Sequence, residues 1–288
     1  MSEIIINGGK RLSGRVSVQG AKNSVLPVLA GTVLCGGESG VHNCPMLSDV
    51  EISLKILEHL GCKCRREGGA VIVDSSGISE YDIPDSLMRE MRSSVVFLGA
   101  VIGRMGRAVI SSPGGCELGP RPIDLHLSAL ERMGVTITEE HGYLKCTAEN
   151  GLHGAEIHLG FPSVGATENI ILAAAVAAGV TVIHNAAKEP EISDLADFLN
   201  SAGARISGCG SDTVRIEGVK RLGGTEHTII PDRIVAATYM ACAAVTGGEI
   251  ELENVMPPHM VSLLWSFREC GCDISVSGKG LRLSAPER

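Results

Sequence analysis

The sequence ATENIILAAAVAAGVTVIHN (residues 166–185) shows the pattern on which the chain is built. A run of small apolar residues typical of a buried helix leads to Gly179, and a short strand then ends in the polar residue Asn185. A linker, an amphipathic helix over 194–202, Gly203 and two more strands follow. The stretch therefore predicts one βαβαββ-like unit.

The same pattern occurs four times along the chain. Glycines at 61, 134, 203 and 271 follow the second helix of each unit, at intervals of 73, 69 and 68 residues. A single unit of this kind cannot bury its own apolar faces, so neighbouring units must pack together. The sequence predicts an α/β fold whose paired helices span 21–34 and 49–60, 93–102 and 124–133, 166–178 and 194–202, and 233–245 and 259–269.

Composition limits the classes of function. Hydrophobic residues make up 44% of the 288 residues and charged residues 20%, which is typical of a globular protein. The net charge of −8 argues against nucleic acid as a partner, because sequence-independent binding of nucleic acid needs a basic face. The longest apolar stretch, 170–183, is too short to span a membrane. Ten cysteines and no secretion signal predict reduced thiols in the cytoplasm.

The linker of the second unit, SPGGCELGPRPID (residues 112–124), differs from the corresponding linkers. Between strand and second helix it leaves eleven residues, whereas the first and third units leave five and eight. Insertions in repeat proteins tend to lie on the binding face. The glycine-rich loop places Cys116 five residues before Arg121, and a nearby positive charge makes a loop thiol more reactive. Although most free cysteines are inert, buried apolar residues, this position favours a functional Cys116.

Polar or charged residues recur where each unit begins its first helix, and helix starts are natural anion sites. Lys22 and Asn23 occupy this position in the first unit, Arg92 in the second, Ser163 in the third and Asp232 in the fourth. Ordinary helix capping explains Ser163 and Asp232 equally well. The nine histidines and the CxC pairs (62/64 and 270/272) lack the spacing of a metal site, so no metal is predicted.

Together these motifs resemble the UDP-N-acetylglucosamine 1-carboxyvinyltransferase family from about Arg11 to the end of the chain. That family has an inside-out α/β barrel of six such units in two domains, of which this sequence has four. The resemblance implies a first domain at 22–224 and a partial second domain at 1–21 plus 225–288. The motifs that carry it are LSG (12–14), GAKN (20–23), LP (26–27), MR (91–92), PGGC (113–116), GPRPIDLH (119–126), SVGAT (163–167), NAAKEPE (185–191) and PDR (231–233).

The resemblance implies that the enolpyruvyl group of phosphoenolpyruvate is transferred to the 3-hydroxyl of UDP-N-acetylglucosamine, without metal or organic cofactor. Cys116 would be the proton donor and the target of fosfomycin, and the loop that carries it would close over the bound nucleotide. Lys22, Arg92 and Arg121 would face phosphoenolpyruvate, with Asn23 at the reacting centre. The nucleotide would be held by Arg121, Pro122, Ile123, Asp124, Leu125, Phe161, Pro162, Ser163, Val164 and Gly165.

Two features depart from the family pattern. Phe161 stands where some members carry a basic residue. The third of the pattern that the sequence lacks carries an aspartate proposed as general base and further arginines, so slow or absent turnover is expected. Two other functions remain open: the sister enzyme 5-enolpyruvylshikimate-3-phosphate synthase, which lacks the PGGC loop, and a non-catalytic module that binds a UDP-sugar.

Overall fold

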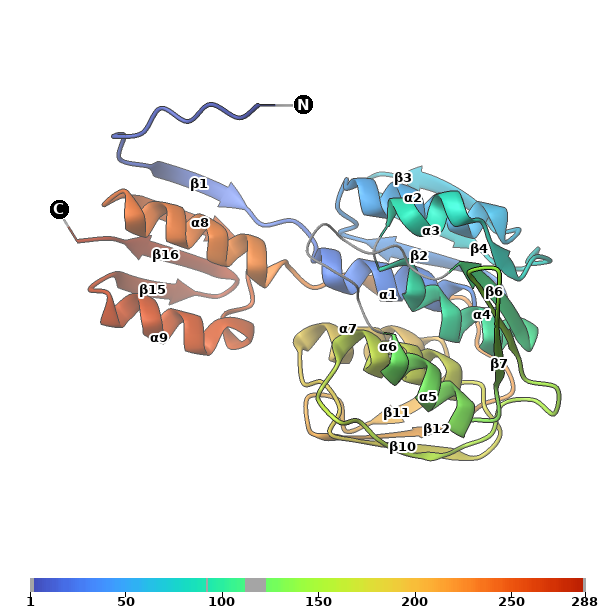
Figure 1. The fold of residues 1–288 in the computed structure, drawn as a ribbon. Coiled ribbons are helices and arrows are strands. Elements are labelled where there is room, and N and C mark those ends of the chain that lie inside the picture. Colours follow the sequence, from blue (N-terminus) through green and yellow to red (C-terminus); the bar gives the residue numbers. More distant parts are fainter. Residues whose placement is uncertain (1–2, 92, 112–122, 287–288) are drawn as a thin grey trace. The chain divides into compact units, whose positions relative to one another are not determined.

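The computed structural model describes residues 3–91, 93–111 and 123–286. The chain divides into two compact units (Figure 1): a larger one, Lys22–Ile229, and a smaller one made of Met1–Ala21 and Ile230–Arg288. The sequence-based boundary lies five residues earlier, at 224/225. Residues 226–228 pair with a strand of the larger unit, which explains why they group with it.

The larger unit holds three four-stranded sheets of one design, with strand orders β13-β2-β4-β3, β5-β6-β8-β7 and β11-β12-β10-β9. In each sheet one edge strand pairs in parallel with the strand that follows the first helix of a repeat, and the other pairings are antiparallel. The strands are β2 (Glu38–His42), β3 (Lys63–Glu67), β4 (Ala70–Asp74), β5 (Asp82–Ile83), β6 (Arg107–Ser111), β7 (Thr136–Glu140), β8 (Tyr143–Thr147), β9 (Glu156–His158), β10 (Val180–His184), β11 (Arg205–Ser207), β12 (Thr213–Glu217) and β13 (Glu226–Thr228).

The parallel edge strands close the three repeats into a ring. β5 follows the first repeat and joins the sheet of the second, and β9 follows the second and joins the sheet of the third. β13 follows the third repeat and returns to the sheet of the first. Each repeat thus supplies a strand to the next, so none of the three can complete its sheet alone.

Helices fill the space between the sheets of the larger unit (Figure 1). The first helices of the repeats form the core: nine of the eleven residues are buried in α1 and in α6, because most side chains of both helices are small or aliphatic. This confirms the inside-out arrangement. The helices are α1 (Lys22–Thr32), α2 (Ser48–His59), α3 (Asp85–Glu90), the 3-10 turn η1 (Ser94–Val96), α4 (Phe97–Met105), α5 (Asp124–Arg132), α6 (Val164–Ala174) and α7 (Pro190–Ser201).

Local geometry repeats with the sequence. All four landmark glycines, at 61, 134, 203 and 271, have φ between +84° and +107°, which explains why glycine ends each second helix. In three repeats an asparagine comes directly after the strand that follows the first helix. This asparagine has a positive φ, and its side-chain amide donates a hydrogen bond to a backbone carbonyl. These bonds are Asn43 to Ile229, Asn185 to Leu159 and Asn254 to Val18.

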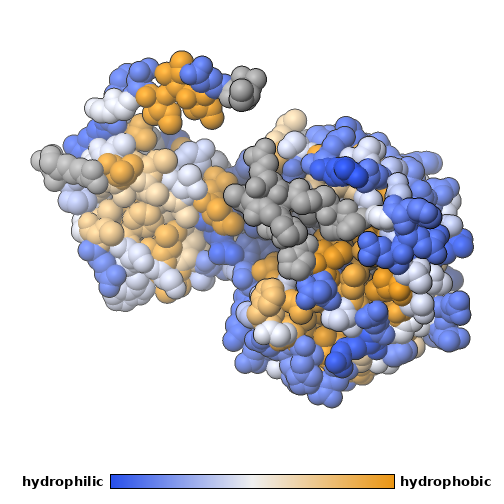
Figure 2. All heavy atoms as spheres, viewed as in Figure 1, coloured by the Kyte–Doolittle hydropathy of each residue, from blue (hydrophilic) through white to orange (hydrophobic). Residues whose placement is uncertain are grey.

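The smaller unit contains the fourth repeat, with the sheet order β1-β14-β16-β15. Its core lies between this sheet and two helices, whose outer faces leave Ile234, Tyr239, Val245, Val261 and Trp265 exposed. Figure 2 shows apolar residues gathered on this unit. Its elements are β1 (Ser13–Ser17), α8 (Arg233–Val245), β14 (Glu249–Glu253), η2 (Pro257–Met260), α9 (Val261–Glu269), β15 (Asp273–Ser277) and β16 (Gly280–Ser284).

One linker length predicted from the sequence is wrong. α7 begins at Pro190 instead of residue 194, because proline has the φ of a first helical residue and needs no hydrogen-bond acceptor there. The linkers before α2 and α7 are therefore both five residues long, 43–47 and 185–189. The corresponding stretch of the second repeat, between β6 and α5, runs from 112 to 123 and remains the longer one.

Candidate functional site

Lys22 and Asn23 are the first two residues of α1, and both are exposed. The Lys22 ammonium lies 2.6 Å from a carboxylate oxygen of Asp49, in the first turn of α2. The ion pair fixes where the lysine points and leaves 46% of its side chain accessible. A lysine above a helix start presents a positive charge and backbone N–H groups to an anion. Sequence reasoning missed Asp49, although it stands at the start of the second helix of the same repeat.

The structure brings together two of the segments assigned to the nucleotide. Ile123 and Asp124 lie at the start of α5, and Ser163 and Gly165 at the start of α6, which packs against α5. The Gly165 backbone lies so close to His126 of α5 that an added Cβ would stand 3.1 Å from the imidazole Cε1. The absence of a side chain at residue 165 thus allows the two helix starts to approach each other.

The structure shows that Ser163 is a helix cap. Its hydroxyl accepts a hydrogen bond from the N–H of Ala166, and Asp232 caps α8 in the same way with bonds from residues 234 and 235. Of the other residues assigned to the nucleotide, Val164 and Leu125 are half-buried, and Pro162 and Phe161 are exposed, Phe161 by 59%. Capping and contact with a ligand are compatible, because a hydroxyl has two acceptor lone pairs and a proton to donate.

A buried network of hydrogen bonds connects residues near the starts of α5 and α6. The Asn169 amide donates to the Nδ1 atom of His126 and to the carbonyl of Val95, and its oxygen accepts the N–H of Gly99. Since Nδ1 accepts, the proton of the neutral ring resides on Nε2. Burial lowers the pKa of His126 to about 4, so the ring is neutral at pH 7. No pattern in the sequence indicated this network, because its members are up to 74 residues apart.

A buried carboxyl group lies one turn into α6. Glu168 is 6% exposed, and its pKa is raised well above the usual value by burial and then by the charges of Glu191 and Glu189 at the start of α7. Burial therefore favours the protonated, neutral form of this carboxyl group. No motif in the sequence indicated it, because a lone glutamate in an apolar helix carries no distinctive spacing.

Four of the predicted site residues lie outside the described residues: Arg92, Cys116, Arg121 and Pro122. The other nine cysteines are described, all as free thiols. Burial raises the pKa of seven of them, among them Cys35 and Cys44 to about 11 and Cys62 and Cys64 to about 12. A raised pKa removes the reactive thiolate, so these seven thiols are poor nucleophiles.

Comparison with known proteins identifies the family. The family model described as EPSP synthase (3-phosphoshikimate 1-carboxyvinyltransferase) matches residues 6–287. UDP-N-acetylglucosamine 1-carboxyvinyltransferase 2 of Caldanaerobacter subterraneus subsp. tengcongensis is 52% identical over 288 residues, which is 100% of this chain and 69% of the relative. The chain belongs to the UDP-N-acetylglucosamine 1-carboxyvinyltransferase family. UDP-N-acetylglucosamine 1-carboxyvinyltransferase 1 of Symbiobacterium thermophilum is 46% identical over 99% of this chain and 66% of its own length.

Solved structures show the same fold at low sequence identity. The enolpyruvyl transferase NikO from Streptomyces tendae superposes with a TM-score of 0.83 at 22% identity, over 98% of this chain and 68% of that one. EPSP synthase from Acinetobacter baumannii gives a TM-score of 0.75 at 21% identity, over 97% of this chain and 66% of that one. The enolpyruvyl transferase fold is therefore confirmed, and the chain spans about two thirds of the length of these relatives.

Among the described residues, no helix is long and apolar enough to cross a membrane.

Proposed function

We propose that this chain carries the nucleotide-binding part of a UDP-N-acetylglucosamine enolpyruvyl transferase, acting in the cytoplasm at the first committed step of peptidoglycan synthesis. In that role it would serve cell-wall biogenesis and, through it, cell shape and division. The observation that carries the proposal is the 52% identity to a UDP-N-acetylglucosamine 1-carboxyvinyltransferase along the whole chain. The geometry of the helix starts in the larger unit supports it.

The two substrates are polyanions, and the residues proposed for them suit that charge. Lys22, oriented by Asp49 and accessible to solvent, would contact the phosphate or carboxylate of phosphoenolpyruvate, with Asn23 beside it. The paired starts of α5 and α6 would hold the uridine nucleotide through residues 121–125 and 161–165. Cys116 would protonate the methylene carbon of phosphoenolpyruvate as the sugar 3-hydroxyl gives up its proton and attacks C2. The new methyl group would then lose a proton as phosphate leaves, which restores the double bond.

We expect these residues to bind the substrates but to catalyse the reaction slowly or not at all. These 288 residues span four of the family's six units, and by the family pattern the other two units supply the aspartate proposed as general base. When the 288 residues are assayed by themselves, we therefore expect saturable binding of UDP-N-acetylglucosamine, with slow or absent release of phosphate from phosphoenolpyruvate. A six-unit relative assayed in parallel gives the reference rate.

Calorimetric titration with UDP-N-acetylglucosamine, alone and with phosphoenolpyruvate, tests the proposal. Lys22→Gln should weaken the binding of phosphoenolpyruvate to the nucleotide complex, whereas the control Lys55→Gln, at an exposed position of α2, should leave it unchanged. No saturable binding of the nucleotide would refute the proposal. Binding of shikimate 3-phosphate instead would favour the sister enzyme, and nucleotide binding without any reaction at Cys116 would favour a non-catalytic module.

Mapping of all ten cysteines after fosfomycin treatment tests the role of Cys116. Modification at Cys116 should increase when UDP-N-acetylglucosamine is present. Cys242 and Cys270 are internal controls, because both are exposed and lie in the smaller unit. Equal modification of Cys116 and these two residues would show that the loop thiol is not activated.

A further inference from the structure

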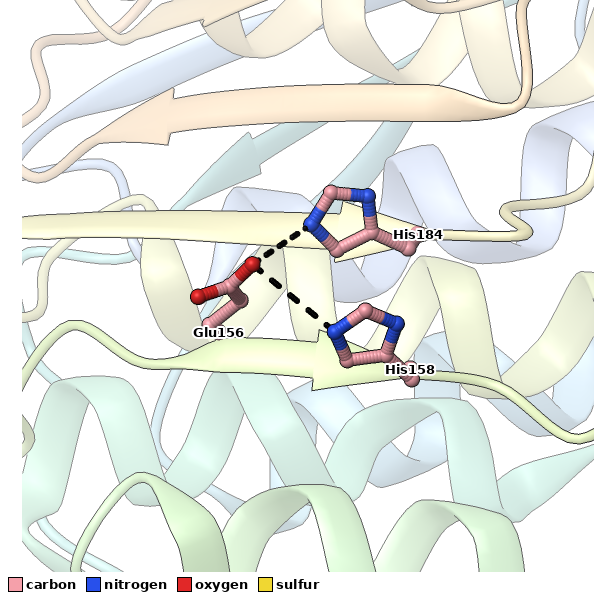
Figure 3. Close-up of side chains that lie close together, drawn as sticks. All are labelled: Glu156, His158 and His184. Atoms are coloured by element: carbon pink, nitrogen blue, oxygen red, sulfur yellow. Dashed lines mark hydrogen bonds and ion pairs between the residues drawn. The ribbon is translucent and has the colours of Figure 1, made fainter.

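Three metal-ligating side chains gather on the outer face of the sheet that contains β9 and β10 (Figure 3). Glu156 and His158 alternate along β9 with Ile157, which is buried. His184, the last residue of β10, stands directly opposite His158 in the parallel pairing. Strand alternation and register therefore place all three side chains on one face, although residues 158 and 184 are 26 positions apart.

The three side chains converge on one point. The Nε2 atom of His184 is 3.0 Å from the Oε1 atom of Glu156, and the Nε2 atom of His158 is 3.7 Å from the same oxygen. The two imidazole rings stack, with centroids 4.3 Å apart and planes 15° from parallel, so both Nε2 atoms face the carboxylate. One ligand atom from each residue lies within 4.8 Å of the other two.

These separations are close to those of a metal site. Zinc bonds of roughly 2.1 Å in a tetrahedron place neighbouring ligand atoms about 3.4 Å apart. Small rotations of the side chains would bring the set to that spacing. The side chains of Glu156 and His158 are 69% exposed and that of His184 is 33% exposed, which leaves both the freedom to rotate and room for water in the remaining positions.

We propose that Glu156, His158 and His184 form a binding site for a divalent transition-metal ion of the Zn²⁺ class. Two imidazoles and one carboxylate suit Zn²⁺, Co²⁺ or Ni²⁺, whereas Mg²⁺ and Ca²⁺ prefer oxygen ligands throughout. The ion would replace the hydrogen bond between Glu156 and His184. It would tie β9, a three-residue strand at the edge of its sheet, to the neighbouring β10.

The first repeat provides an internal comparison. There β13 pairs with β2 in the same parallel fashion, and the equivalent positions hold Glu226, Thr228 and His42. The Nε2 atom of His42 contacts the Oε2 atom of Glu226 at 2.5 Å, so the Glu–His pair is the same. Thr228 stands in place of the second imidazole. The third repeat thus has a second histidine, His158, where the first has Thr228, and this side chain extends a Glu–His pair to a set of three possible ligands.

The test is titration of the whole chain with ZnCl₂, followed through the imidazole nitrogens in two-dimensional proton–nitrogen NMR spectra. The signals of His158 and His184 should shift together and saturate at one equivalent, whereas that of His42 should stay in place. Residue-specific signals distinguish this site from zinc bound by thiols. Parallel shifts of all three histidines, or no shift at His158 and His184 up to millimolar zinc, would overturn the proposal.

Two substitutions, each giving one repeat the residue that the other repeat has at the equivalent position, make the test more specific. His158→Thr copies the first repeat and should weaken zinc binding at least about tenfold, since even an outer-shell partner of a metal ligand is worth 10- to 100-fold in affinity. Thr228→His should make the His42 signal respond to zinc. Both positions are at the surface, and every cysteine is unchanged in both variants, so thiol binding cancels in the comparison. Equal affinity of the wild type and His158→Thr would refute the site.

Discussion

His126 provides the sharpest test of the buried network in the larger unit. Its Nδ1 atom accepts a hydrogen bond of 2.9 Å from the Asn169 amide, and the asparagine is held in that orientation by Gly99 and Val95. A proton on Nδ1 would face the N–H group of Asn169, donor against donor. Protonation therefore requires the loss of this bond in addition to the burial of a charge.

The size of the effect follows from the shift of the pKa. Burial lowers the pKa of His126 from 6.5 to about 4, so between these values the unfolded chain binds a proton that the folded chain does not. Stability contributed by the neutral ring is complete above pH 6.5 and is lost as the pH falls toward 4. Linkage gives a loss of about 2 kcal/mol between pH 7 and pH 5 for a shift of this size.

The perturbation is His126→Asn, because the Asn oxygen lies near the position of Nδ1 and can accept the same hydrogen bond without titrating. The smaller side chain leaves a cavity, so the variant should be less stable at pH 7, by about 1–3 kcal/mol. At pH 5 this deficit should shrink by about 2 kcal/mol, since only the wild type loses the contribution of a neutral histidine. All other titrating groups are common to both proteins and cancel in the difference.

Urea unfolding at pH 7 and pH 5, followed by far-ultraviolet circular dichroism, measures the difference. The single tryptophan, Trp265, belongs to the smaller unit, so its fluorescence should follow a transition that the substitution leaves unchanged. A deficit that is the same at both pH values would refute the assignment of His126 as a buried neutral ring. So would a deficit that grows at pH 5.

Three further substitutions test the core of the larger unit. Gly99→Ala should destabilise it by about 1–3 kcal/mol in urea unfolding, because the new Cβ would lie 2.3 Å from the Asn169 carbonyl oxygen; wild-type stability would contradict the close helix contact. Glu168→Gln should raise the melting temperature at pH 8, and the gain should fall as the pH drops below 4.5, where the wild-type carboxyl group becomes protonated in the unfolded chain as well as in the folded one; a gain independent of pH would contradict a raised pKa at Glu168. Asp194→Ala should cost about 2–4 kcal/mol, because the carboxylate accepts hydrogen bonds from α1 and β13; an unchanged midpoint of unfolding would show that these bonds are dispensable.

Much of the fold could be predicted from the repeat. Residues 233–245 form a helix with the predicted bounds, and the other main helices begin or end within a few residues of them. The short parallel edge strands β5, β9 and β13 were not predicted. They have two or three residues each, so neither an alternating pattern nor an apolar run distinguishes them in the sequence, and the neighbouring repeat supplies their pairing partners.

The sequence by itself determined the number of repeats, the glycines that end the second helices and the set of residues that resemble a known transferase. These are local properties: a helical period, a positive φ and a motif each depend on residues close together in the chain. Only the tertiary structure decided that Asp49 pairs with Lys22, that His126 is neutral beneath two helix starts, and that Glu156 meets two histidines on one face. The physical reason is that ion pairing, desolvation and metal ligation depend on distances through space, and strand pairing between repeats sets those distances.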